Sequence, residues 1–152
     1  MTYQKNQKRN AERKHRMVNT FLQSMFPYCE VKYNGVEGVD HRIIFGGKTT
    51  FVETKTCKKF IKAGKGNRLG QFKIDNEKKK PYIWSQHLDL ANKGGWYIFM
   101  AGHQMYGIPA DKLKYIISGE RKKYGISWDK IANITYPNWL EDLKKQVYGV
   151  KE

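Results

Sequence analysis

Two acidic residues and a lysine flank a tight turn in the stretch 38–55, GVDHRIIFGGKTTFVETK. Two runs rich in branched and aromatic residues surround a Gly-Gly pair, and this pattern predicts a β-hairpin with a two-residue turn. In that register Asp40 lies directly opposite Glu53. Lys55 follows Glu53 by two positions and therefore shares its face of the strand. The hairpin is predicted to bring the three side chains into one cluster.

The chemistry of this cluster favours a divalent cation. Directly opposed side chains have Cβ atoms about 4.5–5.5 Å apart, and two like charges at that distance are destabilising. Mg²⁺ would offset the repulsion between Asp40 and Glu53, since it typically binds one or two protein carboxylates together with phosphate and water oxygens. We expect Mn²⁺ to substitute for it, and Lys55 to act as a charge or a proton carrier. The alternative interpretation is a solvated hairpin with an ordinary ion pair between Glu53 and Lys55.

The order of these residues resembles the PD-(D/E)xK nuclease superfamily. Asp40 follows a predicted strand, and after twelve intervening residues an apolar strand carries Glu53, Thr54 and Lys55. Val39 stands where the family usually has Pro. The resemblance implies a restriction-endonuclease-like fold of the α/β (α+β) class, in which helices flank a mixed central β-sheet. It also implies a Mg²⁺-dependent endodeoxyribonuclease that hydrolyses phosphodiester bonds, with Asp40 and Glu53 as metal ligands.

Within this superfamily the chain is most similar to the archaeal and phage-type Holliday junction resolvases. A predicted helix, PYIWSQHLDLAN (81–92), precedes a Gly-Gly pair and the buried strand WYIFMA (96–101). In those enzymes a Gln on this helix lies near the metal and orients water or phosphate, and Gln86 is the matching position. Gln71 is a second candidate, and a surface amide is the alternative interpretation of Gln86. The resemblance further implies a homodimer that cuts branched DNA.

A basic helix is predicted over residues 8–26, where apolar residues recur at helical spacing until Pro27. Resolvase-like nucleases often carry a Glu on their first helix that joins the metal site. Glu12 is the candidate here because it is the only acidic residue before Glu30. It lies roughly 130° from the centre of the apolar stripe. A surface charge beside Arg16, four residues later, is therefore an equally good interpretation of Glu12.

The formal net charge of +15 and the pI of about 9.8 favour a polyanionic partner. Basic residues concentrate in residues 1–16 and 55–80. We expect the segment 56–80 to be a mobile, glycine-punctuated loop with a short strand at 71–74. Contacts to the phosphate backbone carry no direct sequence information, which favours a structure-selective enzyme. The candidate nucleic-acid-binding residues are Lys8, Arg9, Arg13, Lys58, Lys59, Lys62, Lys65 and Arg68.

The 152 residues are expected to form a single nuclease domain, since 39% are hydrophobic and 14% aromatic. A strand at 104–108 should pair antiparallel with 96–101, and helices within 110–148 should complete the core. No apolar run reaches the roughly 18 residues that span a bilayer, so no membrane partner is expected. The basic N-terminus does not resemble a secretory signal, and two cysteines form no disulfide framework. These features predict a cytoplasmic protein, associated with the nucleoid or with a host cytoplasm if viral.

Two other functions are compatible with the sequence. A non-catalytic, basic nucleic-acid-binding protein has the same composition. The sequence around Asp40 and His41 also looks a little like the start of an HNH nuclease motif, in which the His is a general base. That motif needs a later metal-binding His and often paired Cys, whereas the next His here is His87, in an ordinary predicted helix.

Overall fold

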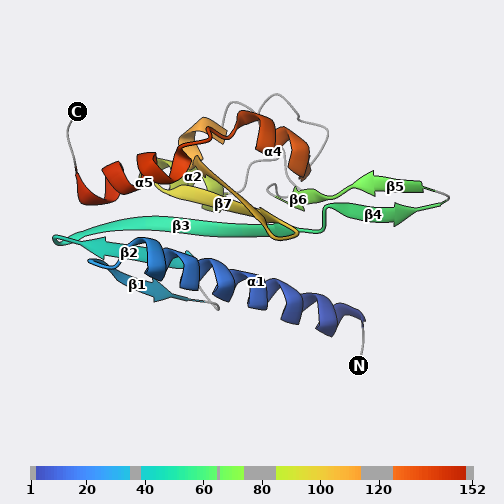
Figure 1. Ribbon diagram of the computed structural model, residues 1–152, viewed down its shortest axis with the longest axis horizontal. Helices are drawn as coiled ribbons and strands as arrows, with labels where there is room; N and C mark the ends of the chain where they lie inside the picture. Colours follow the sequence, from blue (N-terminus) through green and yellow to red (C-terminus); the bar gives the residue numbers. More distant parts are fainter. Residues whose placement is uncertain (1–2, 35–38, 65, 74–84, 114–124, 150–152) are drawn as a thin grey trace.

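The computed structural model describes residues 3–34, 39–64, 66–73, 85–113 and 125–149. A five-stranded mixed sheet forms its centre (Figure 1). The strands lie in the order β1 (Glu30–Tyr33), β2 (His41–Phe45), β3 (Lys48–Cys57), β7 (Trp96–Ala101) and β8 (Gln104–Pro109). β3 and β7 run parallel, and the other neighbouring strands are antiparallel. The fold is therefore mixed α+β, with a central sheet flanked by helices, as the sequence predicted.

The hairpin between β2 and β3 has the predicted register. Gly46 and Gly47 adopt φ values of 58° and 76°, and a two-residue turn of type I′ requires such left-handed values at both positions. Phe45 pairs with Lys48, and the ladder runs back to the pair of His41 with Val52. The next pair in this register is Asp40 opposite Glu53.

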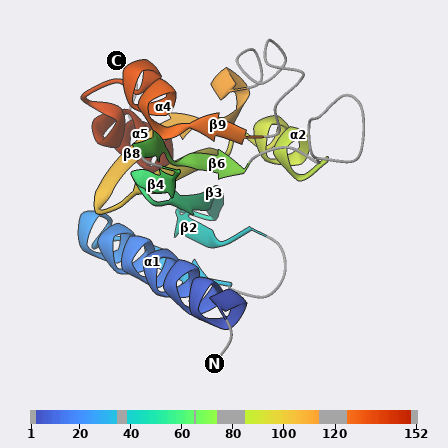
Figure 2. The same ribbon diagram turned by 90° about the vertical axis from the view of Figure 1, so that its right-hand side faces the viewer.

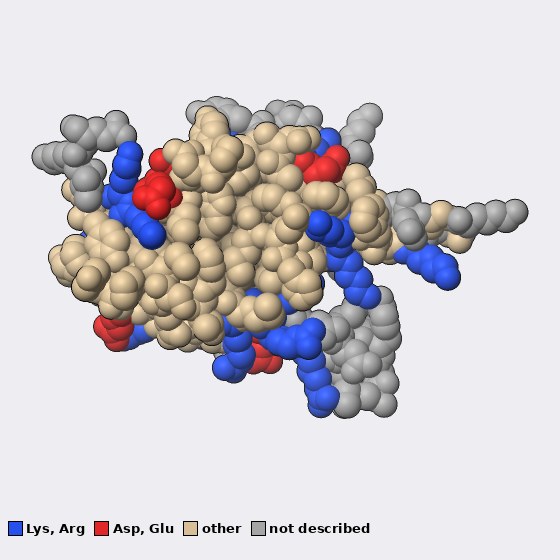
Figure 3. Space-filling model, in the orientation of Figure 1, with Lys and Arg blue, Asp and Glu red and all other residues tan. Residues whose placement is uncertain are grey.

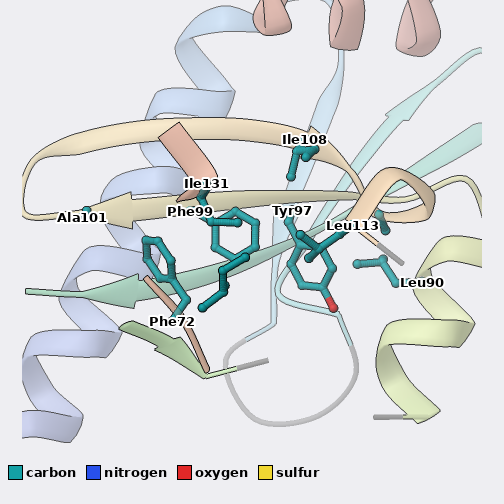
Figure 4. Close-up of a cluster of buried hydrophobic side chains, with 10 residues drawn as sticks. Phe72, Leu90, Tyr97, Phe99, Ala101, Ile108, Leu113 and Ile131 are labelled. Carbon is teal, nitrogen blue, oxygen red and sulfur yellow. The ribbon is translucent and has the colours of Figure 1, made fainter. Parts of the chain in front are cut away.

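Two hydrophobic clusters cover the two faces of the sheet. β7 is buried along its whole length, and its residues alternate between the clusters. One cluster packs α1 (Tyr3–Met25) and α5 (Trp139–Tyr148) against β2, β3 and β7. The other cluster packs α2 (Ser85–Asn92) and α4 (Trp128–Ile134) against the opposite face (Figure 4). α1 and α4 consequently lie on opposite sides of β3 (Figure 2).

The prediction of a mobile loop over residues 56–80 was wrong for the part that the structure describes. β4 (Phe60–Ala63) and β5 (Gly66–Leu69) form an antiparallel ribbon that turns at Gly64, where φ is 60°. Gly64 permits the left-handed turn, and Phe60 and Ile61 supply the residue types that favour a strand on the β4 side. The predicted strand at 71–74 is confirmed as β6 (Gln71–Lys73), which pairs with β9 (Gly125–Ser127).

The remaining predictions differ from the structure at element ends. The first helix begins at Tyr3 rather than at residue 8. The predicted helix 81–92 is described from Ser85 onward. Within 110–148 a helical turn begins at Ala110, α4 and α5 follow, and residues 114–124 lie outside the description. No helix in the described ranges is long and apolar enough to cross a membrane.

Candidate active site

Asp40 immediately precedes β2, at the end of the β2–β3 ladder. The β2–β3 ladder stops at His41, whereas β3 continues to Cys57. The backbone N–H of Thr54 therefore has no ladder acceptor on the β2 side, and it donates a hydrogen bond of 3.0 Å to Asp40 Oδ2 instead. A buried backbone N–H needs such a partner. The bond holds the Asp40 carboxylate against the edge of β3.

Glu53 meets Asp40 at this edge. Their carboxyl groups lie within hydrogen-bonding reach of each other, and such a bond needs a proton on one of the two. Burial, the hydrogen bond and the charge of Asp40 together raise the pKa of Glu53 to about 9, although Lys55 acts in the opposite direction. Glu53 is therefore protonated at neutral pH.

Lys55 completes the predicted cluster. It lies two residues after Glu53 on the same face of β3. Glu53 pairs with Tyr97 of β7, and Lys55 pairs with Phe99. Burial lowers the pKa of the Lys55 ammonium, while the charges of Glu53 and Asp40 oppose that effect. A half-buried amine beside two carboxyl groups is costly for stability and is a common mark of a functional site.

His15 is a fourth member of the cluster, which the sequence analysis missed. It projects from α1, and its Nδ1 lies 3.9 Å from Asp40 Oδ2. Burial lowers the pKa of His15, and the positive charge of Lys55 lowers it further. The negative charges of Asp40 and Glu12 act in the opposite direction and raise it. The signal in the sequence was its position three residues before Val18, because that spacing puts His15 on the flank of the apolar stripe that packs on the sheet.

Among the remaining catalytic candidates, Glu12 lies beside the cluster and not within it. Glu12 is exposed, and its Oε1 accepts a hydrogen bond of 3.1 Å from Arg16 Nη2. This is the surface ion pair that was the alternative prediction, so Glu12 influences the site through its charge on His15. Gln86 lies in the first turn of α2, but its side chain is outside the described residues. Gln71 is exposed on β6.

A hydrogen-bond chain beneath the cluster fixes α1 to β3. His41 Nδ1 lies 3.0 Å from Asn19 Oδ1, and His41 Nε2 lies 2.6 Å from Thr54 Oγ1. Burial lowers the pKa of His41 to about 4, so the ring is neutral at pH 7. Because Asn19 Oδ1 only accepts, Nδ1 carries the hydrogen and Nε2 accepts from the Thr54 hydroxyl. Both ring nitrogens are therefore engaged inside the core, which favours a structural His41 over the general base of an HNH nuclease.

The Asp40–Glu53 pair fits a hard divalent cation. Among the residues that the structure describes, no three His, Cys, Asp or Glu side chains come together as a ligand set. Two carboxylates nevertheless suffice for Mg²⁺, which keeps several waters and takes substrate phosphate oxygens as further ligands. A cation bound by both carboxyl groups would offset the charge repulsion that helps to raise the pKa of Glu53.

Exposed basic residues lie on the two segments next to this site, namely α1 and the residues that follow β3. Arg9 and Arg13 are exposed on α1, and Lys58 and Lys62 are exposed after β3. Burial raises the pKa of Cys57 to about 11, and the positive charge of Lys14 opposes this rise. Lys14 therefore places a positive charge of α1 close to the end of β3. Figure 3 shows Lys and Arg side chains along α1 and toward the β4–β5 end of the molecule.

The other predicted nucleic-acid contacts are described only in part. Lys59 is half-buried, with its Nζ 5.2 Å from the centroid of the Trp128 ring. Lys65 lies outside the described residues, as do the side chains of Lys8 and Arg68.

Comparison of the sequence with known protein families and with curated proteins finds no match. The assignment of a function therefore depends on the geometry around Asp40 and on the chemistry that this geometry supports.

Proposed function

We propose that the protein is a metal-dependent DNA endonuclease with a restriction-endonuclease-like, PD-(D/E)xK active site. The observation that carries this proposal is the pair of carboxyl groups, Asp40 and Glu53, which lie against each other beside the half-buried Lys55. An ordinary ion pair with Lys55 would lower the pKa of Glu53, whereas burial and Asp40 raise it here. Two acids forced together beside an amine are an arrangement that a divalent cation stabilises.

Each residue of the cluster has a separate role in this reaction. Asp40 and Glu53 would hold Mg²⁺ or Mn²⁺, which when bound polarises the scissile phosphate and lowers the pKa of the attacking water. The Thr54 N–H keeps Asp40 in place, so the ligand is positioned before the substrate arrives. Lys55 stabilises the negative charge that develops on the phosphate, or orients the water. His15 lies close enough to Asp40 to reach a water on that carboxylate.

The substrate is proposed to be DNA held through its phosphates. The exposed arginines of α1 and the lysines after β3 provide contacts that act on any sequence. Structure selectivity, a Holliday junction as substrate, a homodimeric assembly and a cytoplasmic location are proposals that follow from the resemblance to resolvases.

A cleavage assay with a panel of substrates tests the proposed function. Four-way junction, flap, nicked, duplex and single-stranded DNA are incubated with the wild-type protein in Mg²⁺, in Mn²⁺ and in EDTA. We expect metal-dependent cleavage by the wild type. We expect at least a 100-fold loss in Asp40→Asn, which retains an acceptor for the Thr54 N–H, and in Lys55→Met. Glu141→Gln, which neutralises an exposed carboxylate on α5, should cleave like the wild type.

DNA binding separates the enzyme from a non-catalytic binding protein. Asp40→Asn should bind DNA as well as the wild type or better, because it removes a negative charge from the site. If the wild type binds every substrate and leaves all of them intact with either metal, the endonuclease proposal fails and the protein is a nucleic-acid-binding module.

A further inference from the structure

The β4–β5 ribbon carries an exposed apolar pair. β4 and β5 pair with each other in a two-stranded sheet and extend away from the body of the molecule (Figure 1). Phe60 and Leu69 lie directly opposite each other across this ribbon, so their side chains share a face. Phe60 is 56% exposed and Leu69 is 36% exposed. A ribbon of this kind with two large apolar side chains in water indicates a contact surface.

The base of the ribbon is held rigidly against the domain. Trp128 Nε1 donates a hydrogen bond of 2.8 Å to the Lys59 carbonyl, and the Trp128 backbone N–H donates one of 3.1 Å to the Gly70 carbonyl. Gly70 N–H in turn donates to the Lys59 carbonyl at 2.9 Å. A Cβ at position 70 would lie 1.6 Å from the carbonyl oxygen of Lys58, so only Gly permits this close approach. The exposed pair is therefore preorganised.

The surroundings of the pair are aromatic and positively charged. The Phe60 ring stands edge-on to the half-buried Trp128 ring, with centroids 6.5 Å apart and an interplanar angle of 86°. Lys59 lies over Trp128, and Lys58 and Lys62 are exposed on either side of Phe60 in the sequence. An aromatic surface framed by lysines is complementary to a nucleobase and its flanking phosphates, since every base has a π-face for stacking.

The ribbon lies close enough to the candidate active site for one DNA substrate to contact both. Phe60 follows Lys55 by five residues, and an extended chain rises about 3.3 Å per residue. The ribbon therefore starts at most about 17 Å from Lys55, which equals roughly five stacked nucleotides at about 3.4 Å each. One strand of DNA is long enough to contact both places.

We propose that the β4–β5 ribbon binds an unstacked base of the DNA on Phe60 and Leu69, while Lys58 and Lys62 contact the neighbouring phosphates. This inference rests on the proposed nuclease function and specifies its substrate class, namely DNA with an unpaired base at a branch point or a single-stranded end. A perfect duplex presents no such base, so the ribbon distinguishes branched from continuous DNA.

Equilibrium binding in EDTA tests the ribbon without any cleavage. The probes are a flap that carries 2-aminopurine at the branch and a duplex of the same length. The wild type should change the 2-aminopurine fluorescence of the flap. Phe60→Ala should abolish that change and weaken flap binding roughly tenfold, with duplex binding unchanged. Phe60→Tyr should behave like the wild type. Tyr28→Ala removes an aromatic residue that is 83% exposed between α1 and β1, and it should have no effect.

Two outcomes would overturn the ribbon inference. One is a Phe60→Ala variant that binds the flap and the duplex as the wild type does. The other is a Phe60→Ala variant that changes only the sedimentation of the protein, which would make the ribbon a self-association surface. The wild-type cleavage panel is a separate measurement. If the wild type cuts no DNA while Phe60→Ala loses its preference for the flap, the nuclease proposal fails and the ribbon inference stands.

Discussion

Binding of Mg²⁺ should release a proton from the Asp40–Glu53 pair, and the affinity should therefore depend on pH. Without the ion, burial and the neighbouring carboxyl raise the pKa of Glu53 to about 9, so Glu53 is protonated at neutral pH. A carboxyl group must lose its proton before it binds a metal. Protons and Mg²⁺ thus compete for the same oxygen atoms.

The size of this effect follows from the pKa. Below about pH 9, each fall of one pH unit reduces the ionised fraction of Glu53, and with it the apparent affinity for Mg²⁺, about tenfold. Binding at pH 7 should be about 100-fold weaker than the limiting affinity at high pH. Close to one proton should be released for each ion bound at pH 7.

Isothermal titration calorimetry at pH 7 and pH 8, in two buffers with different ionisation enthalpies, measures both quantities. Glu53→Gln should bind Mg²⁺ weakly and without this pH dependence. Glu141→Gln, whose exposed carboxylate belongs to α5, should retain the wild-type behaviour. An affinity that is equal at pH 7 and pH 8, with no buffer-dependent heat, would refute the protonated pair.

Three further predictions concern stability and binding. Glu53→Gln should stabilise the metal-free protein by as much as about 3 kcal/mol at pH 7 in urea unfolding. At pH 7 the wild type must take up a proton on Glu53 when it folds, which costs free energy that the Gln variant does not lose. The stability difference should vanish below about pH 4.5, where Glu53 is also protonated in the unfolded chain. Thr54→Val should lower the free energy of unfolding by about 1–3 kcal/mol, because it leaves the buried acceptor of His41 unsatisfied; an unchanged urea midpoint would contradict this. Joint replacement of Lys58 and Lys62 by Gln should reduce the slope of log K for DNA against log salt by about two, whereas an equal slope would exclude phosphate contacts there.

The hairpin was predictable because its register depends on a local signal. The Gly-Gly pair fixes the turn, and the turn fixes the pairing back to His41 and Val52; the same register extended by one position puts Asp40 opposite Glu53. The strand over 96–101 was equally clear, since six apolar residues in a row suit a strand that is buried on both faces.

Contacts between distant segments were not predictable in the same way. The approach of His15 to Asp40 depends on how α1 crosses the edge of β3, and the sequence gives the helix face but not the crossing. The ribbon of residues 60–69 was missed because its glycines and lysines are typical of loops. Its stability comes partly from Trp128, which lies far away in the sequence.

The central claim is that Asp40 and Glu53 together bind a divalent cation. Anomalous diffraction from crystals of the wild-type protein soaked in Mn²⁺ tests this claim most directly. We predict an Mn²⁺ peak in contact with carboxylate oxygens of both residues, at about 2–2.3 Å, in place of the hydrogen bond that now joins them. Carboxyl groups that remain hydrogen-bonded to each other at saturating Mn²⁺, with the ion bound elsewhere, would contradict the account.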